Sequence, residues 1–391
     1  MSKLFKLLTT MILALSLSVF FIACDKGGET SDSGDATTGE FVYELATGED
    51  DAGKEYEYYK ITGYTVTSED ALKMANGDFS TVSGKRDIVI PNEYNGKNVE
   101  EIAPAAFADR IIIKSIKFEL DTKIKTIGAG AFSGCANLEE IINLPFIGKS
   151  VDAAGEERVL GFVFGSGTAV AGLTDVTAKA YDELTTTDLT FKVPSNLKKI
   201  TFVGEKVTEC AFFGFNMLEE IVMENATFVG ASAFSGCVKL ISLNLPAVTF
   251  INDNAFAGCS ALQRVAFGSA LEFIGDGAFN GCSYLGYNYV TEDENLIKLV
   301  IPASVKYIGN NAFASCALLK YVEIGAGVTE IKTGVFAGCS DLKKVTANSD
   351  IRIQISAFAG CNKDKLYLNG KKFGDVDSLL GSLAFGEIDL T

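Results

Sequence analysis

One pattern recurs nine times along the chain, and each copy is centred on a phenylalanine. These residues are Phe107, Phe132, Phe212, Phe234, Phe256, Phe279, Phe313, Phe336 and Phe358. An isoleucine or valine stands five residues before each of them, at Ile102, Ile127, Val207, Val229, Ile251, Ile274, Ile308, Ile331 and Ile353. The residue directly before the phenylalanine is alanine in eight copies and valine in the ninth. The regular spacing is 22 or 23 residues, and a period of this length predicts a solenoid of stacked turns.

Seven copies also carry a cysteine three residues after the phenylalanine, at Cys135, Cys237, Cys259, Cys282, Cys316, Cys339 and Cys361. Apolar residues that alternate with polar ones follow, as at Leu243 and Leu245, and this alternation predicts a short strand with one buried face. Pro246 and Pro302 directly follow such strands and cannot continue the hydrogen-bond ladder. The sequence therefore predicts about nine to ten turns in which phenylalanine, isoleucine and cysteine form ladders in the core.

Two stretches, IGDGAFNGCSYL and FINDNAFAGCSALQRVAF, show the pattern most fully. They resemble the BspA-like, treponemal-type leucine-rich repeat, and the resemblance extends over about residues 85–362. The resemblance implies a β-rich α/β repeat solenoid and a surface lipoprotein. It also implies an adhesive role, because this family is associated with attachment to matrix proteins, epithelial cells and other bacteria. Two copies depart from the pattern, since Arg110 and Phe215 stand where cysteine is expected.

The N-terminus has the features of an export signal. Lys3 and Lys6 precede an uncharged apolar run that ends at Ala23, and Cys24 then stands where a bacterial lipoprotein is lipidated. Phe21 departs from the leucine that is usual in this motif, and the alternative is an uncleaved membrane anchor. The predicted organisation is a signal peptide at 1–23, a disordered Gly/Ser/Asp-rich tether at 24–40, a cap at 41–84, the solenoid at 85–365 and a second cap at 366–391.

Two segments interrupt the spacing. The gap between Phe132 and Phe212 exceeds one repeat by 57 or 58 residues, which predicts an insertion at 146–196. An 11-residue excess lies between Leu285 and Leu296 and forms a candidate binding loop, although a passive insertion is the alternative. Its candidate contact residues are Tyr287, Tyr289, Glu292, Asp293 and Glu294.

The outward positions of the predicted strands form the other candidate binding surface, which we call the strand face. Ordinary solvated strand surface is the alternative for any one of them. The strand face consists of Glu140, Glu220, Ser242, Asn244, Arg264, Lys298, Tyr321, Glu323, Lys344 and Thr346.

The composition argues against several function classes. The chain has no histidine, which excludes catalytic triads and dyads that depend on it and removes the commonest transition-metal ligand. The formal net charge is −16 without a basic stripe, so nucleic acid is not an expected partner. We expect no enzyme activity, cofactor or metal. A glycosidase would need clustered carboxylates in the 146–196 insertion, where the acidic residues are dispersed along the sequence.

The seven ladder cysteines occupy one equivalent position, and parallel side chains of this kind are poorly placed for disulfides. We therefore expect free structural thiols, although disulfides are common in exported proteins. Cys210 lies off this ladder and is the cysteine expected to be most reactive.

The resemblance implies a cell-surface adhesion protein, and the N-terminal motif predicts that lipid on Cys24 holds it in the outer membrane of the bacterial envelope. The expected partners are proteins or glycans of host cells, matrix or other bacteria, and the membrane itself through the lipid. The alternative is a periplasmic or envelope scaffold without a host-binding role.

Overall fold

The computed structural model describes residues 40–66, 86–167, 171–181, 186–288, 293, 297–348, 351–354, 356–362 and 365–372. All of them belong to one compact unit, Gly39–Thr391, and the other unit is Met1–Thr38. The predicted signal peptide, the lipidation site Cys24 and nearly all of the predicted tether therefore lie outside the described residues.

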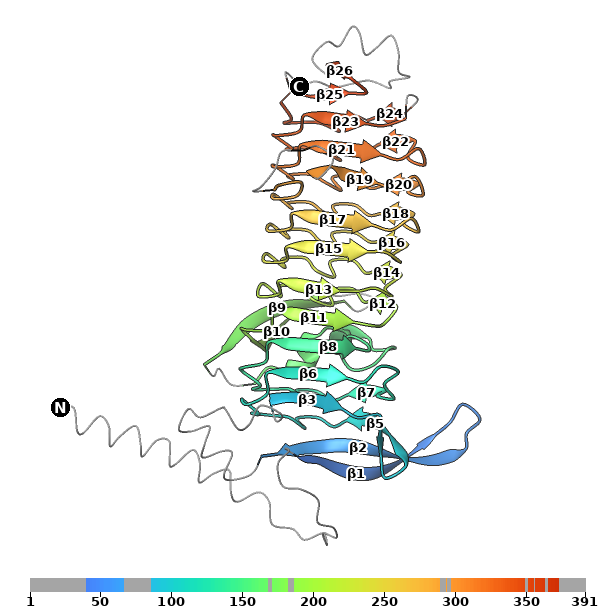
Figure 1. Ribbon diagram of the computed structural model, residues 1–391, viewed down its shortest axis with the longest axis vertical. Helices are drawn as coiled ribbons and strands as arrows, with labels where there is room; N and C mark the ends of the chain where they lie inside the picture. Colours follow the sequence, from blue (N-terminus) through green and yellow to red (C-terminus); the bar gives the residue numbers. More distant parts are fainter. Residues whose placement is uncertain are drawn as a thin grey trace, which may run out of the picture. The chain divides into compact units, whose positions relative to one another are not determined.

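Parallel strands stacked in sequence order form one side of the solenoid (Figure 1). Adjacent strands place equivalent repeat positions opposite each other, for example Leu243 opposite Val265 and Val322 opposite Val345. The first seven strands are β3 (Asp87–Ile90), β6 (Ser115–Phe118), β8 (Glu140–Leu144), β11 (Lys199–Phe202), β13 (Glu220–Val222), β15 (Ser242–Leu245) and β17 (Arg264–Phe267). After a break come β19 (Leu299–Ile301), β21 (Tyr321–Ile324), β23 (Lys344–Thr346) and β25 (Tyr367–Leu368). The predicted repeat solenoid is confirmed, with about 11 turns.

A second side is built from two-residue strands. Each places one residue outward and then the isoleucine or valine of the repeat pattern inward, as in β16, where Ile251 is buried and Phe250 is exposed. Five of these strands form a parallel sheet: β12 (Lys206–Val207), β14 (Phe228–Val229), β16 (Phe250–Ile251), β18 (Phe273–Ile274) and β20 (Tyr307–Ile308). Further along, β22 (Glu330–Ile331) pairs with β24 (Arg352–Ile353).

The third side consists of turns around each pattern phenylalanine, and its backbone explains why helix is rare there. The residues two before and two after all nine phenylalanines have φ between 53° and 79°, as at Asn254 and Gly258. Residues in the left-handed conformation interrupt a right-handed helix, and glycine or asparagine adopts this conformation at least cost. The α/β description of the repeat is therefore corrected to a β-solenoid. Among the described residues its helices are short, namely the 3-10 turn η1 (Gly155–Arg158) and α4 (Gly161–Phe164).

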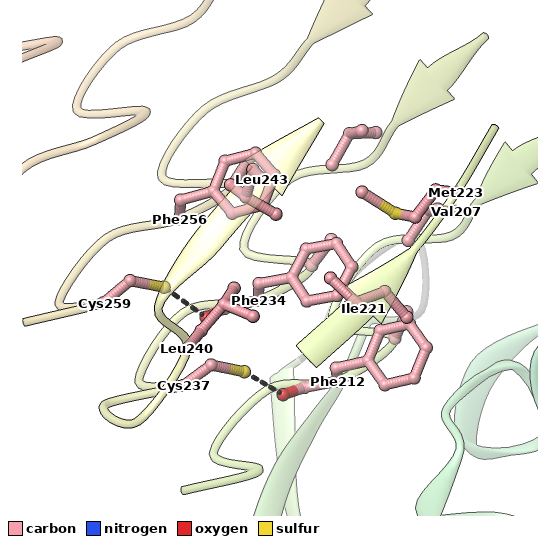
Figure 2. Packing of buried hydrophobic residues seen from close by; sticks show 14 of the residues in the cluster. Val207, Phe212, Ile221, Met223, Phe234, Cys237, Leu240, Leu243, Phe256 and Cys259 are labelled. Carbon is pink, nitrogen blue, oxygen red and sulfur yellow. Dashed lines mark hydrogen bonds between the residues drawn. The ribbon is translucent and has the colours of Figure 1, made fainter. Parts of the chain in front are cut away.

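The phenylalanine rings stack in the core. Neighbouring centroids lie 4.8 to 5.8 Å apart from Phe212 to Phe358, and Phe107 stacks on Phe132 at 5.3 Å. Phe212, Phe234 and Phe256 are fully buried in this ladder (Figure 2). A parallel stack also aligns the backbone, because the amide of Phe234 donates to the carbonyl oxygen of Ala255 in the next turn at 2.7 Å.

The cysteine ladder has a hydrogen-bonding role that the sequence did not reveal. Each thiol donates to the carbonyl oxygen of the phenylalanine one turn earlier, as Cys237 does to Phe212 and Cys259 to Phe234, both at 3.2 Å (Figure 2). All eight cysteines in the described residues are free and buried, which confirms the expectation of structural thiols. The expected reactivity of Cys210 is wrong, because its side chain is 0% exposed.

Burial also controls the acid–base chemistry of these thiols. It raises the pKa of Cys259 to about 12, and it raises the pKa of Cys282 well above its usual value. We expect a Cys24→Ser variant to react with an aromatic disulfide reagent at least about 100-fold more slowly when folded than in denaturant, because the thiolate is the reactive species and unfolding must expose it. The measurement is the release of coloured thiolate with time. Rapid modification of several cysteines in the folded protein would contradict the buried ladder.

The segment predicted as an insertion at 146–196 contains a degenerate turn of the solenoid. Val159 and the buried Phe164 repeat the five-residue spacing of the pattern. The amide of Phe132 donates to the carbonyl oxygen of Val163 at 2.8 Å, just as Phe107 donates to Ala131 at 2.7 Å. The short helix α4 replaces the left-handed corner before the phenylalanine, and the positive φ after it falls one residue early, at Gly165 with φ 70°. The pattern is therefore hard to recognise in the sequence.

A hairpin extends from this degenerate turn. It consists of β9 (Leu173–Tyr181) and β10 (Thr186–Pro194), which pair antiparallel. Two acidic side chains of the segment have separate partners, since Lys149 pairs with Glu157 and Lys192 with Asp175. Asp182 and Glu183 lie outside the described residues.

An antiparallel hairpin of β1 (Glu40–Glu49) and β2 (Glu55–Thr65) precedes the solenoid. Strand β2 pairs with β5 (Lys97–Ile102), which in turn pairs with β7 (Thr126–Ile127) and, antiparallel, with β4 (Glu93–Tyr94). The rings of Phe41 and Tyr64 contact Phe107, the first ring of the ladder, at 6.1 and 5.9 Å. At the other end β25 pairs with β26 (Lys371–Lys372). The caps predicted at 41–84 and 366–391 remain a prediction, and residues 67–85 and 373–391 lie outside the described residues.

A buried carboxylate ties the N-terminal hairpin to the first turns. The side chain of Glu100 on β5 is 5% exposed and accepts from Lys125 at 2.7 Å, Tyr56 at 2.6 Å and Asn98 at 3.1 Å. Burial alone would raise the pKa of Glu100, but these three hydrogen bonds outweigh it and hold the pKa below its usual value. The folded state therefore favours the ionised carboxylate.

The lowered pKa predicts a pH-dependent contribution to stability. Glu100 stabilises the fold above its unfolded-state pKa, and this stabilisation is lost as the pH falls through the lower folded-state pKa. We expect Glu100→Gln to cost about 1–3 kcal/mol of unfolding free energy near neutral pH, and we expect the difference from wild type to shrink toward about pH 3. Urea denaturation at several pH values measures both. A difference that does not change with pH would contradict the assignment.

Candidate functional site: the strand face and its hollow

The structure places all ten residues of the strand face on the outward side of the parallel stack, and none of them is buried. Glu140, Lys298, Tyr321 and Lys344 are partly buried, while the other six are exposed. Parallel register brings several into direct succession, because Glu220 lies opposite Ser242 and Ser242 opposite Arg264. The candidates therefore form two runs, one on each side of the break between β17 and β19.

Much of the charge on this face is paired within these runs. Lys199 lies between Glu140 and Glu220, with 3.5 Å from its Nζ to a carboxylate oxygen of each. Lys298 contacts Glu323 at 2.5 Å. Exposed pairs of this kind typically contribute only about 0–1 kcal/mol, so a ligand can displace them at little cost. The Arg264 guanidinium is exposed and has no partner among the described residues.

The strand face is hollowed where the stack is broken between β17 and β19. The cavity has a volume of about 350 Å³. Four strand-face residues line it, together with both ends of the 11-residue excess and five neighbouring residues. These are Ser242, Asn244, Arg264 and Lys298; then Leu285, Gly286 and Ile297; then Leu243, Gln263, Val265, Ala266 and Leu299. The structure thus brings the two sequence-predicted surfaces together at one place, which we call the strand-face hollow.

The candidate loop is described only in part. The amide of Gly286 donates to the carbonyl oxygen of Gln263 at 2.9 Å, which fixes the loop's first residue against the preceding turn. Tyr287 is partly buried and meets Tyr284 edge to face, with 5.7 Å between ring centroids. Asp293 is exposed. Tyr289, Glu292 and Glu294 lie outside the described residues.

The strand-face hollow presents hydrogen-bonding groups around an apolar floor. The guanidinium of Arg264 offers a planar fork for a carboxylate, and Asn244, Gln263 and Ser242 supply amide and hydroxyl groups. Val265 is only partly buried there, so apolar surface remains accessible. This combination suits recognition of a polar ligand that carries a carboxylate.

Sequence reasoning did not identify Gln263 and Ala266 as part of this site. The only signal available was their place in, or directly before, the last strand that precedes the 11-residue excess. The hollow depends on how far the loop separates β17 from β19, and residue spacing does not specify that distance.

No cluster of three or more histidine, cysteine, aspartate or glutamate side chains that could hold a metal ion occurs within the described part of the chain. Likewise, no helix among the described residues is long and apolar enough to span a membrane.

Comparison with solved structures finds several bacterial leucine-rich repeat proteins. A Treponema pallidum leucine rich repeat protein is 18% identical, with 86% of this chain and 92% of that chain covered and a TM-score of 0.25. The pneumococcal vaccine antigen PcpA is 20% identical, with coverages of 78% and 68% and a TM-score of 0.35. A leucine rich cell surface protein from Faecalibacterium prausnitzii is 19% identical, with coverages of 93% and 96% and a TM-score of 0.29.

A search of curated proteins finds no match. The sequence does match a protein family, described as the BspA type leucine rich repeat region, in six copies over residues 57–151, 185–293 and 286–368. These residues make up well over half of the chain. The chain therefore belongs to the BspA type leucine rich repeat family.

Proposed function

We propose that this protein is a lipid-anchored adhesion protein of the bacterial cell surface. In this proposal its strand face binds a protein or glycan of host matrix, epithelial cells or other bacteria. Membership of the BspA type family supports a binding role, because a leucine-rich repeat solenoid typically presents an extended surface to partners. The observation that carries the proposal is the strand-face hollow, where four strand-face residues and the base of the candidate loop meet.

The strand-face hollow has the composition and the concave shape of a binding hot spot. Binding hot spots are enriched in arginine and tyrosine and lie in concave, desolvated places. Arg264 supplies such a side chain without first having to break an ion pair within the described structure. Tyr321 continues the strand face on β21, and its register partner Lys344 extends it to β23.

The binding proposal is tested with the mature protein against a panel of immobilised extracellular-matrix proteins. We expect at least one of them to bind, and we expect Arg264→Ala to weaken that binding at least about tenfold, the cost of one desolvated hot-spot side chain. Arg352→Ala is a matched control, because Arg352 is also an exposed strand arginine but lies on β24 of the second side. Equal effects of the two variants would contradict a site at the hollow.

Surface location and anchoring are tested separately. Protease treatment of intact cells should remove the solenoid if the protein faces the outside, whereas a periplasmic scaffold would survive until the outer membrane is opened. Cys24→Ala should release the protein from the detergent phase or leave its signal peptide uncleaved. An unchanged mature mass with unchanged detergent partitioning would contradict lipidation of Cys24.

A further inference from the structure

An aromatic row lies on the second side of the solenoid, away from the strand face. Outward strand positions usually carry polar residues, as Lys206 does on β12 and Arg352 on β24. On this second side, strands β14, β16, β18 and β20 carry an aromatic ring at the outward position instead. We call these four residues the aromatic row: Phe228, Phe250, Phe273 and Tyr307. The ring of Phe250 is 43% exposed and the other three are partly buried.

The rings of the aromatic row contact one another along the stack. Phe250 and Phe273 have centroids 6.3 Å apart, and Phe273 stacks on Tyr307 at 4.7 Å. This arrangement follows from parallel register, which places Phe250 opposite Phe273 and Phe273 opposite Tyr307. Phe250, Phe273 and Tyr307 therefore form a strip of aromatic carbon across three turns. The ammonium group of Lys332 lies 4.0 Å from the ring centroid of Tyr307, and that of Lys206 lies 5.7 Å from the ring centroid of Phe228.

A polar hollow of about 510 Å³ lies on the third side of the same turns. We call it the amide hollow, and its polar side chains are those of Asn254, Asp276, Asn280, Asn310, Asn311 and Ser315. The side-chain amides of Asn254, Asn280 and Asn311 form no hydrogen bond with the described residues. Their donors and acceptors are therefore available to a ligand.

Backbone geometry explains only some of the polar residues in the amide hollow. Asn254, Asn311 and Ser315 have positive φ, a conformation that asparagine tolerates better than most residues. Asn280 has no such constraint, and the equivalent positions of the flanking turns are Ala257 and Ala314. The exposed amide of Asn280 thus adds hydrogen-bonding capacity that the fold does not require.

The aromatic row and the amide hollow adjoin each other at one corner. Phe273 precedes Asp276 by three residues, and Tyr307 precedes Asn310 by three residues. Three residues span at most about 10 Å, which is the length of about two sugar rings. The backbone amide of Asn310 donates to the carboxylate of Asp276 at 2.8 Å, which holds the two turns in register at this corner.

We propose that this corner binds a neutral carbohydrate chain. Sugar hydroxyls are donors and acceptors at once, and side-chain amides offer both functions in the same group. The apolar C–H faces of pyranose rings can pack on the aromatic row, because aromatic side chains provide apolar surface at the rim of polar sites. The amide hollow has only one carboxylate and no basic side chain among its lining residues, so it favours a neutral ligand.

This site is separate from the strand face. Its residues belong to the second and third sides of the turns that contain Phe256, Phe279 and Phe313, whereas Arg264 and Lys298 belong to the first side. The inference therefore stands or falls independently of the proposed function.

The test is isothermal titration calorimetry of the mature protein with neutral hexasaccharides of glucose, mannose, xylose and N-acetylglucosamine, and with hexagalacturonic acid for comparison. We expect binding of at least one neutral hexasaccharide. Asn280→Ala and Phe250→Ala should each weaken this binding at least about tenfold, because each removes a side chain that contacts the bound sugar. Asn225→Ala, in the turn after β13, and Val300→Ala, on β19, are exposed substitutions away from this corner and should leave it unchanged, and thermal melts should show that all four variants fold.

Several results would overturn the inference. They are the absence of binding to every neutral hexasaccharide, binding of hexagalacturonic acid alone, and neutral-sugar binding that survives both Asn280→Ala and Phe250→Ala. Loss of matrix-protein binding in Asn280→Ala, with no sugar binding in the wild type, would assign the corner to a protein partner and would also overturn it.

Discussion

Phe256→Ala is expected to lower the free energy of unfolding by about 3–5 kcal/mol, the usual cost of truncating a fully buried phenylalanine. Phe256 is 0% exposed, and its ring stacks on Phe234 and Phe279, each at 5.1 Å. The substitution would leave a cavity in the middle of the ladder, where the backbone is held by hydrogen bonds to both neighbouring turns. Those bonds limit how far the turns can collapse into the cavity.

Glu323→Ala provides the comparison. Glu323 is an exposed strand-face residue whose pair with Lys298 is solvent-accessible, so its loss should cost less than about 1 kcal/mol. Urea denaturation followed by circular dichroism measures both variants. Because each turn of a solenoid contacts only its neighbours, hydrogen exchange in Phe256→Ala should increase most in the turns of Phe234 and Phe279. Equal destabilisation by the two variants would mean that the buried side has been assigned wrongly.

The regular turns could be predicted from sequence because each turn packs only against the turn before it and the turn after it. Each buried position recurs at a fixed spacing, so Ile251, Phe256 and Cys259 could be assigned to the core from the pattern alone. The alternation in the strand likewise placed Ser242 and Asn244 outward. Local spacing is sufficient wherever the neighbours of a residue are its own equivalents one turn away.

Features that depend on irregular spacing could not be predicted in this way. The hollow beside Arg264 lies where the parallel pairing on the first side stops at β17 and resumes at β19. The aromatic row was visible as Phe250, Phe273 and Tyr307 at equivalent positions, six residues before a pattern phenylalanine. Its significance became apparent only when the structure showed that these rings are outward and in contact. The thiol–carbonyl bonds of the cysteine ladder likewise require three-dimensional coordinates.

The degenerate turn at Phe164 shows the same limit most clearly. Its distances from Phe132 and Phe212 are 32 and 48 residues, so no regular period marks it. Only tertiary contacts identify it as part of the stack. Leu160 donates to the carbonyl oxygen of Ala211 at 2.9 Å, and Thr208 donates to that of Arg158 at 2.9 Å, so both bonds join this segment to the next turn.

Phe164→Ala is accordingly expected to cost about 3–5 kcal/mol, as much as truncation of a regular ladder residue, because Phe164 is 0% exposed within the continuous core. Glu156→Ala, an exposed change in the same segment, should stay within about 0.5 kcal/mol of wild type. A passive insertion would tolerate both substitutions, since it could open without disturbing the turns on either side. Urea denaturation of the two variants therefore distinguishes a structural turn from an insertion, and a small effect of Phe164→Ala would show that the stack closes directly from Phe132 to Phe212.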